Sequence, residues 1–165
     1  MAPLALITEP GRMPWLKAAA IGAALLVVPL VWWTALWLAG TRVPVPVPSG
    51  LSMMLVVVAA IFIAPLIETA VLAVLHWLIV ARFGADRAIF VLAATVAAVA
   101  AHMPVTLVRT PVTAAIFIVF ALQYAGWCAA RGWRSAFLGT ALAHAVYNAG
   151  SLILSPLWAL LLRPA

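Results

Sequence analysis

The sequence predicts an all-α, polytopic transmembrane helix bundle with about five spanning helices and a short C-terminal interfacial helix. Two observations lead to this fold class. Of the 165 residues, 68% are hydrophobic and 7% are charged, whereas a soluble domain carries about 25% charged residues. The apolar residues also gather into runs long enough to cross a bilayer at about 1.5 Å per residue. We therefore treat residues 1–165 as a single membrane domain.

The net charge of +6 could also indicate a nucleic-acid-binding protein. However, the nine basic residues lie singly or in pairs around the apolar runs, as topology signals do. This distribution favours the lipid bilayer over nucleic acid as the partner. The single cysteine, Cys128, excludes an intrachain disulfide.

The first two apolar runs cover residues 18–39 and 51–81. The first is too long for the apolar core of a signal peptide, so we predict an uncleaved helix that Pro29 kinks. Residues 40–50 contain three prolines at alternate positions and predict an extended loop. The second run predicts one long, tilted or kinked helix. The alternative is two short helices broken just before Pro65.

The remaining apolar runs predict three further helices, at residues 88–108, 112–130 and 135–155. Short polar turns separate them, and Pro104 is expected to loosen the end of the first. The segment 156–162 is too short to span a bilayer and is predicted to lie at the interface or to cap the bundle.

Five spanning helices place the connecting segments alternately on two sides of the membrane. Six basic residues fall on the N-terminal side and three on the other: Arg12, Lys17, Arg82, Arg87, Arg131 and Arg134 against Arg42, Arg109 and Arg163. The excess of positive charge predicts a cytoplasmic N-terminus and a C-terminus outside.

Four polar side chains lie deep within these runs: Glu68, His102, His144 and Asn148. Counted from the N-terminal side of the membrane at 1.5 Å per residue, all four lie at a depth of about 14–21 Å. His144 and Asn148 are four residues apart and share a helix face. Because ionisable groups at mid-bilayer are costly, one layer of them indicates a functional site more than a purely structural hydrogen-bond network.

The chemistry that these four residues permit is acid–base catalysis on a water molecule. Glu68 and His102 could share a proton near neutral pH, and His144 and Asn148 could donate hydrogen bonds to a developing oxyanion. This layout can hydrolyse a peptide bond with neither a metal nor a cofactor. The rival is a zinc site with glutamate and histidine ligands. Against it, the sequence has no HExxH motif, and an amide such as Asn148 is not a usual zinc ligand.

Other polar positions give weaker signals. Cys128 and Ser151 lack the sequence context of a catalytic nucleophile, so we interpret Cys128 as a small core residue. His76 lies five residues from Ala81 and beside Trp77, and we interpret it as an interfacial residue without a catalytic role.

Three segments in order resemble the motifs of the CAAX-protease and bacteriocin-processing family (CPBP, also called Abi), over about residues 60–150. The segment 64–68 resembles the lead-in to the family's E-E-x-x-x-R motif, and His102 falls where its F-x-x-x-H motif would lie. The segment 123–132 is followed by a helix with the H-x-x-x-N motif, here His144 and Asn148.

The resemblance implies a glutamic intramembrane protease of a bacterial inner membrane that cleaves a membrane-anchored protein or peptide. According to this resemblance, Glu68 and His102 would activate water, and His144 and Asn148 would form the oxyanion hole. The chain departs from the family at three positions: Thr69 replaces the second glutamate, Ala73 the arginine and Ala98 the phenylalanine. Because the second glutamate and the arginine are both absent, neither charge is left without its partner.

Thr69 is expected to support Glu68, because its hydroxyl can donate to a carboxylate or to the backbone carbonyl four residues earlier. A divergent active protease is the first hypothesis. The alternatives are a catalytically silent membrane partner on the same fold, such as an immunity or assembly protein, and a small transporter or channel. The last would be expected to show an internal repeat or paired broken helices, which the sequence lacks.

Overall fold

The computed structural model describes residues 3–41, 51–102 and 107–161, and every element in these ranges is helical. The elements are α1 (Pro3–Thr8), α2 (Pro14–Ala24), α3 (Val27–Leu38), α4 (Leu51–Val58), the π-helix η1 (Ala59–Ile63), α5 (Ala64–His76), the π-helix η2 (Trp77–Arg82), α6 (Arg87–His102), the 3₁₀-helix η3 (Leu107–Arg109) and α7 (Thr110–Leu161).

Four helical segments are long and apolar enough to cross a membrane: Pro14–Leu38, Met53–Arg82, Thr110–Arg131 and Trp133–Trp158. The predicted all-α bundle of a membrane protein is therefore confirmed. The third predicted span begins as expected, but α6 has 16 residues and ends at His102. Its expected last turn with Pro104, and most of the predicted loop at 40–50, lie outside the described residues.

The first span is interrupted between α2 and α3, four residues before Pro29. Proline has no N–H, so it cannot donate to the carbonyl of Leu25 as a helical residue would. That carbonyl instead accepts a hydrogen bond from the N–H of Val28, at 3.1 Å. The predicted kink at Pro29 is thus present as a tight turn at Leu25 and Leu26.

The second span, by contrast, is not broken at Pro65. Residues 51–82 are continuously helical, because a wider π-helical turn, η1, precedes the proline. In this turn the N–H of Ala64 bonds to the carbonyl of Ala59, five residues earlier. The alternative of two separate short helices is therefore wrong.

The helix α7 consists of two arms that reverse direction at Gly132, where φ is 81° and ψ is 170°. This region of backbone space is essentially restricted to glycine. The predicted turn at residues 131–134 is confirmed. The predicted separate interfacial helix after residue 155 is wrong, because the second arm continues through Pro156 to Leu161. Pro156 has no N–H to donate to the carbonyl of Leu152, so the arm continues past it with one helical hydrogen bond fewer.

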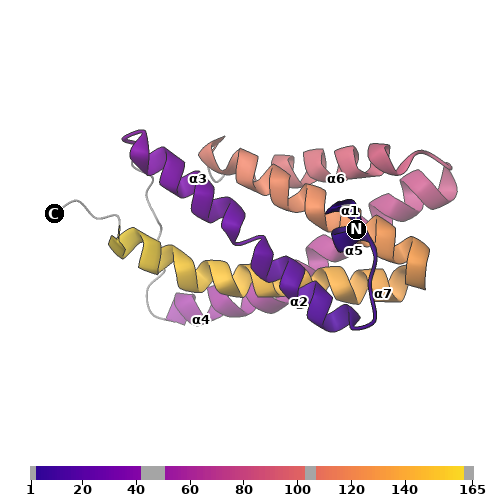
Figure 1. Ribbon diagram of the computed structural model, residues 1–165, viewed down its shortest axis with the longest axis horizontal. Coiled ribbons are helices and arrows are strands. Elements are labelled where there is room, and N and C mark those ends of the chain that lie inside the picture. The colour runs from indigo at the N-terminus through magenta and orange to yellow at the C-terminus, as the bar shows by residue number, and fades with distance from the viewer. Residues whose placement is uncertain (1–2, 42–50, 103–106, 162–165) are drawn as a thin grey trace.

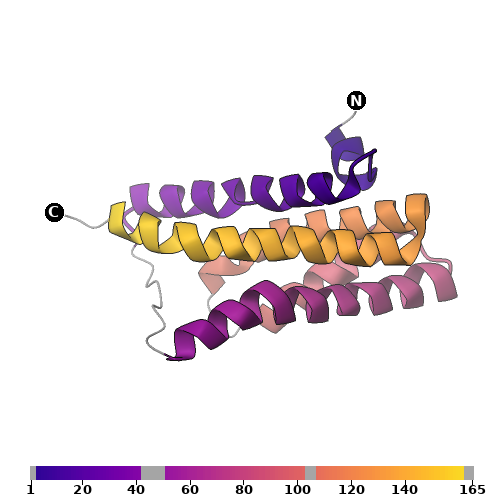
Figure 2. The ribbon, with the colours of Figure 1, turned by 90° about the horizontal axis from the view of Figure 1, so that it is seen from below.

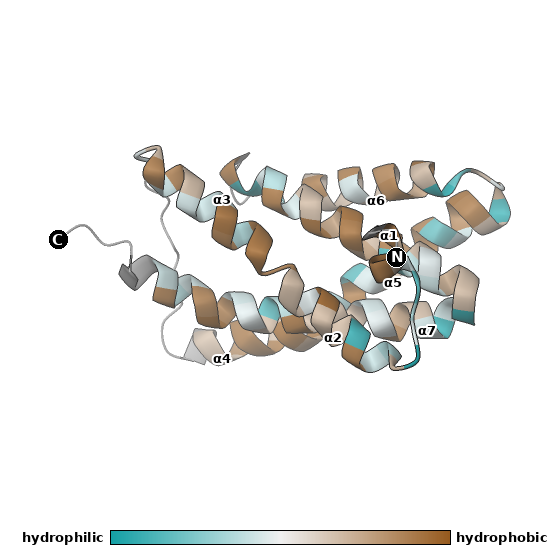
Figure 3. Cartoon of the chain, viewed as in Figure 1, coloured by the Kyte–Doolittle hydropathy of each residue, from teal (hydrophilic) through white to brown (hydrophobic). Residues whose placement is uncertain are grey.

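The second arm of α7 is the centre of the bundle. It lies between α2–α3 on one side and α4–α5 on the other (Figures 1 and 2), and α6 packs mainly on α7 as well. Gly22 allows α2 to approach the second arm closely, since a Cβ at that position would collide with the carbonyl of Ala143. Hydrophobic residues predominate along the helices (Figure 3), and many large apolar side chains are exposed, such as Leu66, Val96 and Ile153.

The short helix α1 was not predicted, because three prolines and a glycine dominate residues 1–14. It packs on the first arm of α7, where the indole of the fully buried Trp127 donates a hydrogen bond to the carbonyl of Ile7, at 3.0 Å. Gly126 provides the room, because a Cβ there would collide with Thr8. Tertiary contacts therefore stabilise a helix that local sequence disfavours.

Candidate active site

Glu68 and His144 face each other across the contact between α5 and the second arm of α7. The Nε2 atom of His144 lies 3.7 Å from Oε2 of Glu68. Glu68 lies in the first turn and a half of α5, which begins immediately before Pro65, and His144 follows the Gly22–Ala143 contact by one residue. The close contact of α2 with the second arm of α7 therefore lies one residue from His144.

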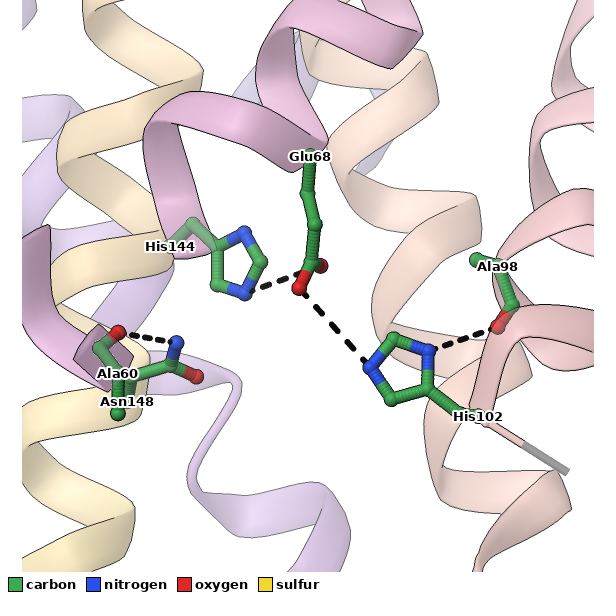
Figure 4. A network of polar contacts seen from close by, with 6 residues as sticks. All are labelled: Ala60, Glu68, Ala98, His102, His144 and Asn148. Carbon is green, nitrogen blue, oxygen red and sulfur yellow. Dashed lines mark hydrogen bonds and ion pairs between the residues drawn. The ribbon is translucent and has the colours of Figure 1, made fainter. Parts of the chain in front are cut away.

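His102, the last residue of α6, approaches the same carboxyl group from the opposite side (Figure 4). Its Nε2 atom lies 4.0 Å from Oε1 of Glu68. Its Nδ1 atom lies 2.7 Å from the carbonyl oxygen of Ala98, one turn earlier in the helix. A carbonyl oxygen only accepts, so Nδ1 carries a proton and Nε2 is the ring nitrogen that faces Glu68.

The expected convergence of these three ionisable side chains is confirmed. Both nitrogen–oxygen separations exceed the length of a direct hydrogen bond and suit a water molecule between the groups. The depth count from the sequence succeeded because the rise per residue of a helix is fixed. The catalytic roles assigned to the three residues stay predictions.

The site is enclosed at His144 and open at His102. The side chain of His144 is 6% exposed, against 24% for Glu68 and 42% for His102. The rings of Phe117 and Phe120, from the first arm of α7, lie with their centroids 5.8 Å and 4.7 Å from that of His144. These aromatic contacts hold the imidazole in one orientation, while the opposite side of the carboxyl group stays accessible.

Asn148 is not part of this triangle of side chains. Its Nδ2 atom donates a 2.7 Å hydrogen bond to the carbonyl of Ala60, in η1. Figure 4 shows the amide directed toward Ala60, one turn along the second arm of α7 from His144. One of its two N–H groups is therefore engaged with the backbone of a neighbouring helix.

Thr69 is fully buried, but its hydroxyl makes no hydrogen bond to any described residue. The expected bond to Glu68, or to the carbonyl of Pro65, is therefore wrong. Residues 68 and 69 differ by about 100° around the helix, and this rotation directs the two side chains to different neighbours.

The sequence left open which neighbours His76 contacts. Its ring is half-buried and lies 5.0 Å from that of Phe90 and 5.4 Å from that of Tyr124, while its expected depth near the membrane interface stays a prediction. Distance from the helix end places a residue along the bundle axis, but only the packing of α6 and α7 determines which face of α5 is covered.

Two fully buried polar residues near the site were not predicted from the sequence. Gln123 and Thr140, on the two arms of α7, are fully buried and their side-chain polar atoms have no hydrogen-bond partner among the described residues. Gln123 is three residues from Phe120, and Thr140 is four residues from His144. Each therefore lies about one turn from the contact between these two rings. Their position within apolar runs was a usable signal, but neither is ionisable.

The alternative for the same side chains is a metal site. Among residues 3–41, 51–102 and 107–161, no group of three histidine, cysteine, aspartate or glutamate side chains has the geometry of a metal site. Neighbouring ligands of tetrahedral zinc lie about 3.3 Å apart, and the nitrogen–oxygen separations here are 3.7 Å and 4.0 Å. The metal-free mechanism stays a prediction.

Comparisons with known proteins add no further constraint on the function. No family model, no curated protein and no solved structure matches the chain.

Proposed function

We propose that the protein is an intramembrane endopeptidase that hydrolyses a peptide bond of a membrane-anchored protein or peptide. The observation that carries the proposal is the convergence of Glu68, His102 and His144, from three helices, around one carboxyl group. Ionisable side chains are rare among membrane-spanning helices and are commonly functional. No cofactor is required by this chemistry.

In the proposed reaction, a water molecule bound between Glu68 and His102 attacks the peptide carbonyl. When Glu68 is ionised and His102 is neutral, the carboxylate oxygen and Nε2 are both acceptors, so a water that donates to both satisfies them. The pair takes one proton from the water as the new carbon–oxygen bond forms. It returns this proton to the leaving amine when the carbon–nitrogen bond breaks.

His144 is the proposed donor to the negatively charged oxygen of the tetrahedral intermediate. Its ring is held by the two phenylalanines and lies next to the carboxyl group that activates the water. Removal of one such preorganised donor costs about 10²–10³ in rate. The sequence predicts Asn148 as a further donor, but one of its N–H groups is bound to the carbonyl of Ala60.

The resemblance to the CPBP family supports the same proposal through the order of Glu68, His102 and the His144–Asn148 pair. We extend the proposal to membership of this family, as a divergent member. The positions of the missing family residues are filled by small buried or partly buried side chains, with Ala98 in the core and Ala73 packed against it. No charge is left there without its partner.

The proposed location is a bacterial inner membrane with a cytoplasmic N-terminus. The start of α2, the turn between η2 and α6, and the turn at Gly132 lie at the same end of the bundle (Figure 1). These segments carry the six basic residues of the N-terminal side. Their position at one end of the bundle supports a cytoplasmic N-terminus, because cytoplasmic segments carry an excess of basic residues.

The second candidate is a catalytically silent membrane partner, such as an immunity or assembly protein. The replacement of the family's second glutamate by Thr69, whose hydroxyl has no partner among the described residues, favours it. A chain that no longer needs catalysis would be free to lose such a supporting group.

Replacement of Glu68 separates the two candidates. The protein is reconstituted into lipid vesicles with fluorogenic peptides that each carry one apolar spanning segment. Glu68→Gln should abolish cleavage, because the amide keeps the shape but cannot accept the proton of water. Glu9→Gln is the matched control, since Glu9 is the other glutamate of the chain and is exposed near α1. Full cleavage by Glu68→Gln would show that Glu68 is not the catalytic base, whereas no cleavage by the wild-type protein would leave the silent partner as the better hypothesis.

A further inference from the structure

The carbonyl of Ala60 has lost its partner within its own helix. In the π-helical turn η1 the N–H of Ala64 bonds five residues back, to Ala59. The next donor at this spacing would be the N–H of residue 65, which would reach Ala60. Residue 65 is proline and has no N–H. The missing hydrogen bond therefore comes neither from Ala64, four positions after Ala60, nor from Pro65, five positions after it.

The side chain of Asn148 takes the place of this missing donor. Its Nδ2 atom lies 2.7 Å from the oxygen of Ala60, although the two residues are 88 positions apart in the chain. The bond joins the second arm of α7 to the helix that carries Glu68. In a membrane, where neither water nor lipid tails can satisfy a buried carbonyl, such a contact is strongly favoured over an unpaired group.

The bond lies on the same two helices as the proposed catalytic pair. Ala60 precedes Glu68 by eight residues, and Asn148 follows His144 by four. The contact is therefore about two helical turns from Glu68 and about one turn from His144, whose facing atoms lie 3.7 Å apart. A rotation or shift of one helix against the other at Ala60 would change this separation directly.

We propose that Asn148 is a positioning residue that substitutes for the absent amide of Pro65 and thereby fixes Glu68 against His144. The hydrogen bond itself does not depend on the proposed function, but its consequence for cleavage rests on that function. In this mechanism the main effect of Asn148 on the reaction comes through the geometry of Glu68, and not through direct contact with the oxyanion.

The test is a rescue experiment in which the backbone donor is restored. Asn148→Ala leaves the Ala60 carbonyl unpaired, so we expect the unfolding midpoint in lipid nanodiscs to fall by roughly 3–8 °C. Pro65→Ala returns an N–H to the helix. Ala60 then receives a backbone donor whether the turn stays π-helical or becomes α-helical, because either spacing supplies one. The double variant Pro65→Ala/Asn148→Ala should recover most of the lost unfolding midpoint. It should also cleave at least ten-fold faster than Asn148→Ala.

Pro29→Ala/Asn148→Ala is the matched control. It also removes a proline from an apolar helix, but Pro29 lies in α3 and does not affect the carbonyl of Ala60. It should show no recovery. The cavity left by Asn148→Ala is common to both double variants and cancels in the comparison.

The possible outcomes separate this proposal from the proposed function. If Pro65→Ala/Asn148→Ala recovers neither stability nor cleavage, the positioning role is wrong. If it recovers stability while cleavage stays 10²–10³ below wild type, Asn148 acts on the oxyanion directly and the positioning role is again wrong. If no variant, including the wild type, cleaves any peptide, the protease proposal fails, and recovery of the midpoint alone still decides whether Asn148 replaces the amide of Pro65.

Discussion

The carboxyl group of Glu68 faces two imidazoles with different surroundings. His144 is enclosed by phenylalanine rings, whereas His102 is more exposed and its Nδ1 is bound to the Ala98 carbonyl. A fixed, enclosed ring suits a hydrogen-bond donor that must not reorganise during the reaction. An exposed ring with a free Nε2 suits exchange of protons with water. The two histidines are therefore expected to respond differently to substitution.

At the residue scale, His144→Phe distinguishes chemistry from packing. Phenylalanine retains an aromatic ring beside Phe117 and Phe120 and removes both ring nitrogens. We expect an unfolding midpoint close to wild type and a cleavage rate lower by about 10²–10³. The measurement is peptide cleavage in vesicles, together with thermal unfolding of the same preparation.

The matched control for this variant is His76→Phe. His76 also lies between aromatic rings, those of Phe90 and Tyr124, but outside the proposed site. It should retain cleavage. Equal rates for the two variants would show that His144 contributes packing and not a hydrogen bond to the reaction.

At the scale of the elements, the turn at Gly132 sets the register between the two arms of α7. Phe120 and His144 are both twelve residues from Gly132, and their rings are in contact. A turn of different length or shape would bring another residue opposite His144. The pairing of Phe120 with His144 therefore depends on the backbone conformation of Gly132.

Gly132→Ala tests this dependence. No atom lies within 4 Å of a Cβ at this position, so the substitution meets no steric obstacle from neighbours. Its cost comes only from φ of 81° and ψ of 170°, and we expect a loss of about 1–3 kcal/mol in the free energy of unfolding. Chemical denaturation in mixed micelles measures it. An unchanged stability would mean that the turn can adopt another conformation.

The elements also show where prediction from sequence succeeds and where it stops. The spans, the turn at Gly132 and the common depth of Glu68, His102 and His144 follow from apolar run length and helical rise, which are local properties. The hydrogen bond of Asn148 could not be predicted, because it depends on the π-helical turn before Pro65. The inward direction of His76 depends in the same way on how α5 packs against α6 and α7.

At the scale of the whole molecule, the distribution of carboxyl groups constrains the chemistry. The chain has three acidic residues. Asp86 lies in the turn before α6, where it accepts a hydrogen bond from the N–H of Ala88 at 2.7 Å, and Glu9 is exposed after α1. Glu68 alone lies within a membrane-spanning segment. Any reaction in the bundle interior that needs a carboxylate base must use Glu68.

This scarcity of anionic groups leads to an expectation about metal dependence. A divalent cation at the site would have a single carboxylate, Glu68, to offset its charge. The Nε2 atoms of the two imidazoles lie 3.7 Å and 4.0 Å from the oxygens of this carboxylate. The proposed base needs no Lewis acid, so we expect full peptide cleavage after exhaustive treatment with a strong chelator. Cleavage is measured before treatment, after it and after return of zinc, alongside the metal content of the protein. Stoichiometric zinc that is lost and regained together with activity would assign the site to a metal-dependent mechanism.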